Sequence, residues 1–330
     1  MTVARLQLAA CAALTVAVSA AAQQPPPPAG TDTVTTAIAG VVKAGVTVKV
    51  IKSGFTGTEG PIGMPDGSLI FTETQANRIT KIDANDQTST FLENTNGSNG
   101  LAWDAKGRLI SVQTTPGKAQ IGAIYPKGSE ATITAAFEGK PYGRPNDLVV
   151  SKAGHVYFSE PGPNPTPGEA PAAPPLPPAV YHVAPDGKVT RVAEGIARPN
   201  GIMLSPDEKT LYVNNTNGTA IVAFDVAADG STSNRRDFAR YSKVSTGANG
   251  VPNSGADGLA VDSEGRLYAC TNAGVEVFSP QGELLGVIPI SLQPQNLAFA
   301  GKDKRTLYVV GRGSAWRVPL DAQGYAGRAK

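Results

Sequence analysis

Six stretches of the chain open with a carboxylate or amide residue, and four of these six residues are candidates for holding a metal ion together. Each stretch continues into an apolar run, a turn and a second alternating run. They read EGPIGMPDGSLIFTE from Glu59, NGLAWDAKGRLISVQ from Asn99, NDLVVSKAGHVYFSE from Asn146, NGIMLSPDEKTLYVNN from Asn200, DGLAVDSEGRLYACTN from Asp257 and QNLAFAGKDKRTLYVVG from Gln295. The carboxylates of Glu59 and Asp257 and the amide oxygens of Asn146 and Asn200 suit Ca²⁺ or another hard cation if the fold brings them together.

Ordinary turn chemistry is the alternative interpretation of these four residues. Asn-Gly and Asp-Gly pairs are common in turns, so each residue alone is a weak signal. Their shared position ahead of an apolar run favours a common role. From the repeats alone, a metal site and plain turns both remain open.

Other familiar catalytic patterns are absent from the sequence. It contains no G-x-S-x-G nucleophile elbow, no H-E-x-x-H, no Walker loop and no Rossmann glycine fingerprint. The only histidines, His155 and His182, are too few for a zinc site of several histidines and argue against a histidine-based triad. We expect both to be structural or surface residues, so any chemistry must use carboxylates, amides and a hard metal.

The repeats predict the elements that position these residues. In the fifth copy, turn signals separate four expected strands, Leu259–Val261, Arg266–Cys270, Val275–Ser279 and Glu283–Ile290. Four short antiparallel strands, repeated six times at roughly 40 to 55 residues, are typical of a six-bladed β-propeller, an all-β fold with very little helix. Because little chain follows the sixth start, the N-terminal strand Val46–Ile51 is expected to complete the last blade. In such a ring the opening residues of the repeats converge at one mouth of the central channel.

Composition and charge exclude several classes of protein. The 330 residues are 41% hydrophobic and 17% charged, which is enough apolar material for a sizeable core. The net charge is +2 and no Lys/Arg cluster stands out, so a nucleic-acid partner is not expected. Cys11 falls in the N-terminal signal described next, which leaves Cys270 without a partner, and we expect it to be a small buried residue.

The N-terminus resembles an export signal. Arg5, an apolar run and a small-residue site before Gln23 predict a signal peptide over residues 1–22 and export to the periplasm or the outside of the cell, with no membrane association after cleavage. Residues 23–40 are predicted to be a disordered Pro-rich leader. Residues 41–330 should form the propeller, with a Pro-rich loop inserted at 161–179 that either forms a rim or lid beside the site or is a solvated linker.

Several motifs resemble one known family. TEGP from Thr58, FTETQANRI from Phe71, RPND from Arg144, RPNGIMLSPDEKTLYV from Arg198 and ADGLAVDSEGRLYACTNAGVEVFSPQG from Ala256 resemble the SMP-30/gluconolactonase/luciferin-regenerating enzyme-like family. The likeness spans nearly all of residues 55–318 in the expected order. It implies a six-bladed β-propeller with one divalent cation at the channel mouth, and hydrolysis of a sugar lactone or related cyclic ester.

The resemblance also assigns roles to residues. Glu59, Asn146, Asn200 and Asp257 would be the metal ligands, and Asp257 would also be the catalytic general base. The cation would be Ca²⁺ first, with Mg²⁺, Mn²⁺ or Zn²⁺ as alternatives. Arg144 and Asn99 would bind substrate. Arg144 could instead be a turn residue. Tyr142 would line the pocket or pack under the loop.

The sequence departs from the family pattern at several positions. These departures weaken the prediction of the substrate and leave the predicted metal ligands unchanged. Glu73, Asn214-Asn215 and the run Ser111–Thr114 each stand where many members have other residues. The expected partner is a small lactone, acted on by a monomer or weak oligomer. A non-catalytic, exported, calcium-stabilised propeller that binds a ligand or acts as a scaffold is the alternative. A hydrolase of phosphoesters or arylesters is a third.

Overall fold

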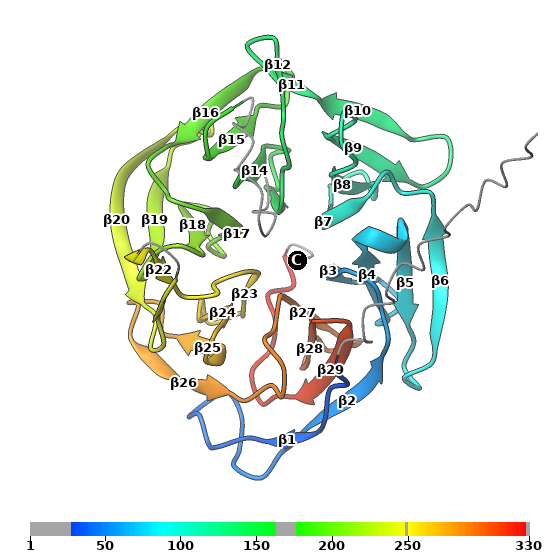
Figure 1. Cartoon of the computed structure of the whole chain (residues 1–330), viewed down its shortest axis with the longest axis vertical. Helices are drawn as coiled ribbons and strands as arrows, with labels where there is room; N and C mark the ends of the chain where they lie inside the picture. Colours follow the sequence, from blue (N-terminus) through cyan, green and yellow to red (C-terminus); the bar gives the residue numbers. More distant parts are fainter. Residues whose placement is uncertain (1–27, 163–175, 248–249, 328–330) are drawn as a thin grey trace, which may run out of the picture.

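The computed structural model describes residues 28–162, 176–247 and 250–327, which form a closed ring of β-sheets (Figure 1). Six antiparallel sheets of four or five strands surround a central axis as the blades of a propeller. The predicted all-β, six-bladed propeller is confirmed. The strands are short because each β-branched or aromatic run ends at a tight turn: after β3, Asp66 Oδ1 accepts the Ser68 N–H and Gly67 adopts a φ of 86°.

Five blades are each built from four consecutive strands, with the first strand innermost (Figure 1). Blade 1 contains β3 (Thr58–Gly63), β4 (Leu69–Glu73), β5 (Arg78–Ile82) and β6 (Thr88–Glu93). Blade 2 contains β7 (Ser98–Trp103), β8 (Leu109–Gln113), β9 (Gln120–Tyr125) and β10 (Ala131–Thr134). Blade 3 contains β13 (Leu148–Val150), β14 (Val156–Glu160), β15 (Ala179–Val183) and β16 (Val189–Ala193). Blade 4 contains β17 (Pro199–Leu204), β18 (Thr210–Asn215), β19 (Ala220–Val226) and β20 (Thr232–Arg240). Blade 5 contains β23 (Leu259–Val261), β24 (Leu267–Thr271), β25 (Gly274–Phe278) and β26 (Leu284–Ile288).

Blade 6 joins the two ends of the chain. Its inner strands are β27 (Asn296–Ala300), β28 (Thr306–Gly311) and β29 (Ser314–Pro319). The fourth strand is β2 (Thr47–Ser53), which pairs antiparallel with β29, and β1 (Thr33–Val34) extends the sheet beyond it. The predicted closure of the ring by the strand at Val46–Ile51 is therefore confirmed.

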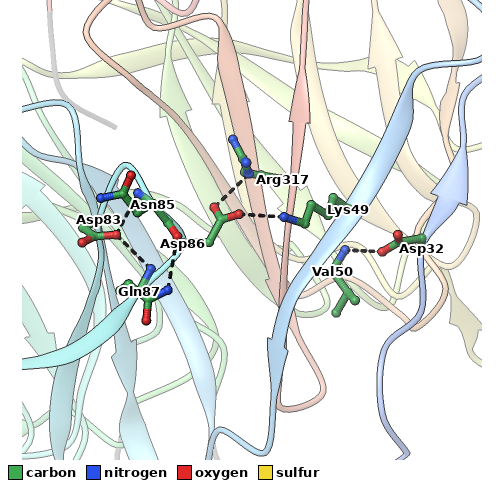
Figure 2. A network of polar contacts seen from close by, with 8 residues as sticks. All are labelled: Asp32, Lys49, Val50, Asp83, Asn85, Asp86, Gln87 and Arg317. Carbon is green, nitrogen blue, oxygen red and sulfur yellow. Dashed lines mark hydrogen bonds and ion pairs between the residues drawn. The ribbon is translucent and has the colours of Figure 1, made fainter.

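A polar network ties this closing strand to blade 1 (Figure 2). Asp86, in the turn between β5 and β6, lies 3.0 Å from Lys49 Nζ of β2 and 2.9 Å from Arg317 Nε of β29. Asp83 holds the turn by accepting the N–H groups of Asn85 and Gln87. These ion pairs link blade 6 to blade 1 on the outer surface, while the apolar side of β2 is buried beneath them.

The core is divided among the contacts between neighbouring blades. One apolar cluster joins blades 3, 4 and 5, and includes Ile202, Val213, Leu259 and Phe278. Another joins blades 5 and 6 and contains Trp316 and Val48, both completely buried. This packing makes the ring a rigid frame for the residues at the starts of the inner strands.

The remaining elements are short. Two hairpins, β11 (Ala136–Phe137) with β12 (Lys140–Pro141) and β21 (Ser245–Thr246) with β22 (Pro252–Asn253), lie outside the blades. A single turn of 3₁₀-helix, η1, covers Thr74–Ala76, and the described ranges contain no α-helix, as predicted. Across those ranges, no helix has the length and apolar character needed to cross a membrane.

The C-terminal segment, described up to residue 327, runs towards the axis of the ring (Figure 1). The Tyr325 N–H donates to Val261 O at the end of β23, and its hydroxyl accepts a 2.7 Å hydrogen bond from Lys152 of blade 3. Lys304 of blade 6 donates to Tyr325 O. Since these contacts lie at the far ends of the inner strands, the segment covers that end of the channel.

One predicted segment differs from the structure, and others lie largely outside the residues that the structure describes. The predicted disordered leader, residues 23–40, is ordered from residue 28 on: Gly30 donates to Ser53 Oγ, and Ile38 is 2% exposed against blade 6. Its apolar residues therefore pack on the closing blade, which their spacing did not reveal. The predicted signal peptide, residues 1–22, and most of the Pro-rich insertion, residues 163–175, lie outside the described residues.

Candidate metal and catalytic centre

The four candidate ligands lie at one mouth of the channel. All inner strands run in the same direction, so their first residues meet on one face. Glu59 is the second residue of β3 and Asn200 the second of β17, while Asn146 and Asp257 each stand two residues ahead of β13 and β23. Glu59, Asn146 and Asn200 are at most 7% exposed. The four residues that open repeats in the sequence thus lie at the same face of the ring.

Three of these four side chains have a buried oxygen atom that accepts no hydrogen bond. These atoms are Asn146 Oδ1, Asn200 Oδ1 and Asp257 Oδ1. Buried polar atoms are nearly always paired, so three orphaned oxygens at one mouth indicate a missing partner that accepts lone pairs. A hard cation is such a partner, and two carboxylates with two amides are donors of the kind Ca²⁺ prefers. The residues present therefore fit a divalent cation.

The donor set is not the kind found in a zinc or iron centre. Among the described residues, no group of three or more His, Cys, Asp and Glu side chains is placed to hold a metal. The fit consequently depends on the amide oxygens of Asn146 and Asn200. Asn200 Nδ2 donates 3.2 Å to Thr216 Oγ1, which in turn donates to Ala256 O, so the other end of this amide presents its oxygen.

Burial and mutual repulsion raise the proton affinity of the two carboxylates. Burial, opposed by a hydrogen bond from Asn296, raises the pKa of Glu59 to about 7, and the charge of Asp147 adds to the rise. Burial and the charges of Glu59 and Asp147 raise the pKa of Asp257 well above its ordinary value. Two carboxylates held together in this way favour a cation between them.

Close approaches between blades hold the ligand backbones. The Gly201 N–H donates 3.1 Å to Asp257 O, and a Cβ on Gly201 would lie 2.8 Å from the Gly258 Cα, closer than real side chains allow. The Gly100 N–H donates to Asn146 O at the same distance, 3.1 Å. The glycines that follow the opening residues are therefore needed for strand approach around the axis.

Residues at the ends of the second strands anchor the loops that carry the ligands. Glu160, at the end of β14, is completely buried and accepts N–H groups from Gly143 and Arg144 at 3.1 and 2.9 Å. Asn215, at the end of β18, accepts the Arg198 N–H at 3.1 Å. The sequence analysis missed these roles, although the polar residues that end each second strand were visible in the repeats.

Asn99 lies directly beneath the site. It is 1% exposed, its Nδ2 donates 2.8 Å to Asn146 O, and its Oδ1 accepts from Thr74 Oγ1 at 3.0 Å. These contacts position Asn146. Binding of substrate by Asn99 stays a prediction.

Tyr142 packs under its loop. Its ring meets Phe158 edge-on at 5.1 Å, and its hydroxyl lies 3.0 Å from Thr134 Oγ1. The residue is 3% exposed, yet it lines an open cavity of about 730 Å³ together with Asn96 and Lys118. Contact between Tyr142 and substrate stays a prediction.

The charges of two arginines and a buried aspartate act on the candidate ligands. The positive charge of Arg144 acts on both Glu59 and Asp257, and opposes the rise in their pKa values. Arg198, which the sequence analysis did not select, is half-buried, and burial together with the charge of Arg144 lowers its pKa. The repeated Arg-Pro-Asn motif was the signal that could have revealed it. Asp147, also missed, is completely buried and accepts the Leu148 N–H at 2.9 Å.

The other potentially reactive groups serve the frame. Cys270 is completely buried, and burial raises the pKa of its thiol, so it is a poor nucleophile. His155 Nδ1 and His182 Nε2 lie 2.8 Å apart at the opposite face, among the far ends of blade 3. The expectations for these three residues are confirmed in their burial and contacts.

Comparisons with known proteins agree on one family. The sequence profile described as SMP-30/Gluconolactonase/LRE-like region matches residues 57–312. A gluconolactonase of Zymomonas mobilis is 29% identical over 292 residues, covering 82% of this chain and 80% of that protein. The structure of a gluconolactonase from Xanthomonas campestris superposes with a TM-score of 0.74 at 28% identity, covering 90% of this chain and 99% of that one. A calcium-binding protein, regucalcin, from Agrobacterium tumefaciens shares the fold, with a TM-score of 0.65 at 19% identity over 84% of this chain and 95% of that one.

Proposed function

Because the chain belongs to the SMP-30/gluconolactonase/LRE-like family, we propose that it is a metal-dependent hydrolase that opens a lactone at the mouth of the propeller channel. Its enzyme class, a lactonase acting on a cyclic ester bond, follows from the gluconolactonases that it resembles over most of its length. The metal dependence and the place of the reaction are part of the proposal, and the chain's own residues support them.

The observation that carries this proposal is the set of orphaned oxygens of Asn146, Asn200 and Asp257 beside the carboxylate of Glu59. The Glu59 carboxylate accepts hydrogen bonds from Gln295 Nε2 at 3.4 Å and Asn296 Nδ2 at 3.2 Å. Because a carboxylate has about four lone-pair positions, these contacts leave room for a cation. A divalent cation held by these four residues would act as a Lewis acid on the lactone carbonyl. Ca²⁺ is the ion that this donor set favours.

Asp257 is the residue best placed to move a proton. Water adds to the lactone carbonyl carbon, the ring C–O bond breaks, and the proton taken from water ends on the former ring oxygen, so lactone and water give a hydroxy acid. Asp257 would accept that proton and return it to the ring oxygen. Its main chain is held on both sides: its N–H donates to Cys270 O, and its carbonyl accepts the Gly201 N–H.

Arg144 would stabilise the negative charge that develops on the carbonyl oxygen. Its main chain is fixed by Glu160, and its charge already acts on Glu59 and Asp257. A fixed cation in a partly buried site lowers the energy of a developing oxyanion without rearranging. Glu59 and Asn200 would hold the ion without taking part in proton transfer.

Replacement of Asp257 tests the proposal. In a pH-indicator assay against small lactones with Ca²⁺ present, Asp257→Asn and Asp257→Ala should lose hydrolysis while circular dichroism stays β-rich. Asp186→Asn, in the exposed turn between β15 and β16, is the matched control and should keep full activity. Retained hydrolysis in both Asp257 variants would contradict the assignment.

The alternative of a non-catalytic propeller is not favoured, because the similar proteins over most of the chain are lactonases. A wild-type protein that binds Ca²⁺ but hydrolyses no aldonolactone, aromatic lactone or acyl-lactone would restore it. We also propose that the protein is exported, on the strength of its N-terminal sequence. Detection of the protein in periplasmic or culture fractions, cleaved near Ala22, tests this part.

A further inference from the structure

The sixth repeat opens with two amide residues that are not among the candidate ligands. Gln295 stands at the position that the four candidate ligands occupy in their own repeats. The next position is glycine in four of the six copies, at Gly60, Gly100, Gly201 and Gly258. In the sixth copy it is Asn296, which is 1% exposed. Blade 6 therefore brings an additional buried amide to this face of the ring.

Main-chain N–H groups fix the direction of both amides. Asn296 Oδ1 accepts the Leu297 N–H at 2.9 Å, and Gln295 Oε1 accepts the Arg312 N–H at 2.7 Å. Because an amide donates only through its nitrogen, the NH₂ groups are left for other partners. Both face the Glu59 carboxylate of blade 1: Asn296 Nδ2 lies 3.2 Å from Oε2, and Gln295 Nε2 lies 3.4 Å from Oε1. Each oxygen of this carboxylate thus has one amide donor from blade 6.

The same two residues also contact the segment that carries the other candidate carboxylate. Gln295 O accepts the N–H of Gly258, the residue directly after Asp257, at 2.7 Å. A Cβ on Gly258 would collide with Asn296 Oδ1, so glycine is required there for blades 5 and 6 to approach each other. Blade 6 therefore holds the Glu59 side chain on one side and the main chain beside Asp257 on the other.

We propose that Gln295 and Asn296 form an amide clamp that positions the Glu59 carboxylate and thereby sets the affinity of the site for its divalent cation. The inference rests on the cation site of the proposed function, and it gives the sixth repeat a role without making it a ligand. A carboxylate held at both oxygens keeps one orientation, so it loses less conformational freedom when the cation binds. Residues that hydrogen-bond to metal ligands commonly change metal affinity by about 10- to 100-fold.

Isothermal titration calorimetry with CaCl₂ tests the amide clamp. Asn296→Gly removes the closer donor and installs the residue that four other repeats carry at this position, so we expect the frame to accept it. The Kd for Ca²⁺ should rise at least about tenfold. Gln295→Met should raise it less, because the contact of Gln295 is longer. The matched control is Ser205→Ala, which removes a buried hydroxyl from the turn between β17 and β18 and should leave the Kd unchanged.

The Ca²⁺ dependence of the rate separates positioning from a general loss of structure. Asn296→Gly should need about tenfold more Ca²⁺ for half-maximal lactone hydrolysis, while its kcat at saturating Ca²⁺ stays near that of the wild type. A kcat that remains low at saturating Ca²⁺ would contradict a role through the affinity for the ion.

The outcomes for the clamp and for the proposed function can be told apart. An unchanged Kd in Asn296→Gly, with lactones still hydrolysed, overturns the clamp and leaves the proposed function intact. A wild type that binds Ca²⁺ and hydrolyses no lactone removes the proposed function, and the comparison of Kd values still decides the clamp. Absence of Ca²⁺ binding by the wild type overturns the clamp.

Should Asn296→Gly not fold, a crystal structure of the Ca²⁺-bound wild type provides the second test. Both amide nitrogens should then lie within hydrogen-bonding distance of the Glu59 carboxylate, at about 2.7–3.2 Å. A Glu59 side chain turned away from Asn296 in the Ca²⁺-bound protein would contradict the clamp.

Discussion

The side-chain amide of Asn214 donates a 2.5 Å hydrogen bond to the main-chain carbonyl of Asp257, and its own oxygen accepts one from Tyr241. Asn214 is completely buried in β18 of blade 4, so the candidate base of blade 5 is positioned by the neighbouring blade. Tyr241 Oη also accepts the Asn215 N–H, and thereby links this contact to the anchor of Arg198. The contact suggests a direct experiment.

Asn214→Leu should lower kcat by more than its loss of thermal stability would explain. It removes the hydrogen bonds that Asn214 makes with the Asp257 carbonyl and the Tyr241 hydroxyl, each worth about 0.5–1.5 kcal/mol, while both groups keep a second partner in the N–H groups of Gly201 and Asn215. Because Asp257 is then less firmly held, kcat should fall at least about tenfold even well below the melting temperature. The paired variant Tyr241→Phe, which keeps the Asn214–Asp257 contact, should lose stability with a smaller loss of kcat. Equal losses of kcat in the two variants would argue against a positioning role.

Chelation of the cation should destabilise the protein as well as inactivate it. A metal that binds only the folded state stabilises it by about 2.7 kcal/mol at roughly 100 times its dissociation constant, so EDTA should lower the Tm by roughly 4 °C in a propeller of this size. Differential scanning calorimetry with and without Ca²⁺ measures the shift. Glu59→Gln should abolish the response to Ca²⁺, whereas Glu93→Gln, at the exposed end of β6, should retain it. A Tm indifferent to Ca²⁺ in the wild type would remove the support for the ion.

The ring and the convergence of the candidate ligands could be predicted because both follow the repeat. Strand-turn-strand alternation recurs six times, and each copy aligns its opening residue with the others, so Glu59, Asn146, Asn200 and Asp257 could be selected without coordinates. The closing strand was predictable from the missing fourth strand of the last blade. These inferences need only local pattern and symmetry.

The supporting contacts could not be predicted in the same way, because they join different parts of the chain. Glu160 holds a loop that precedes its own blade, and Asn214 reaches the next blade. Neither contact can be predicted from the local periodicity of the sequence. The order of the leader likewise depends on distant partners: the main-chain carbonyl of Val41 accepts the N–H groups of Asp321 and Ala322 near the opposite end of the chain.

Closure of the ring should depend on the apolar face of β2 more than on its ion pairs. Val48 is completely buried in the blade 5–6 cluster, and Val48→Ala should cost about 1–3 kcal/mol through a cavity. Lys49 is 53% exposed in its pair with Asp86, so Asp86→Asn should cost less than about 1 kcal/mol, even though it also contacts Arg317 (Figure 2). Urea unfolding of the two variants measures both. A larger loss for Asp86→Asn would show that the polar network closes the ring.

Acid should lower the free energy of unfolding through His182, which lies in blade 3 at the face opposite the candidate ligands. This residue is 3% exposed and lies 2.8 Å from His155; burial, with a smaller contribution from the charge of His155, lowers its pKa from 6.5 to about 4. Because the folded pKa is depressed, the stabilisation is fully present above pH 6.5 and is lost as the pH falls towards 4, by about 3 kcal/mol in all. The free energy of unfolding should therefore drop through this window, and less so in His182→Gln. An identical pH dependence in the variant and the wild type would contradict a neutral, buried His182.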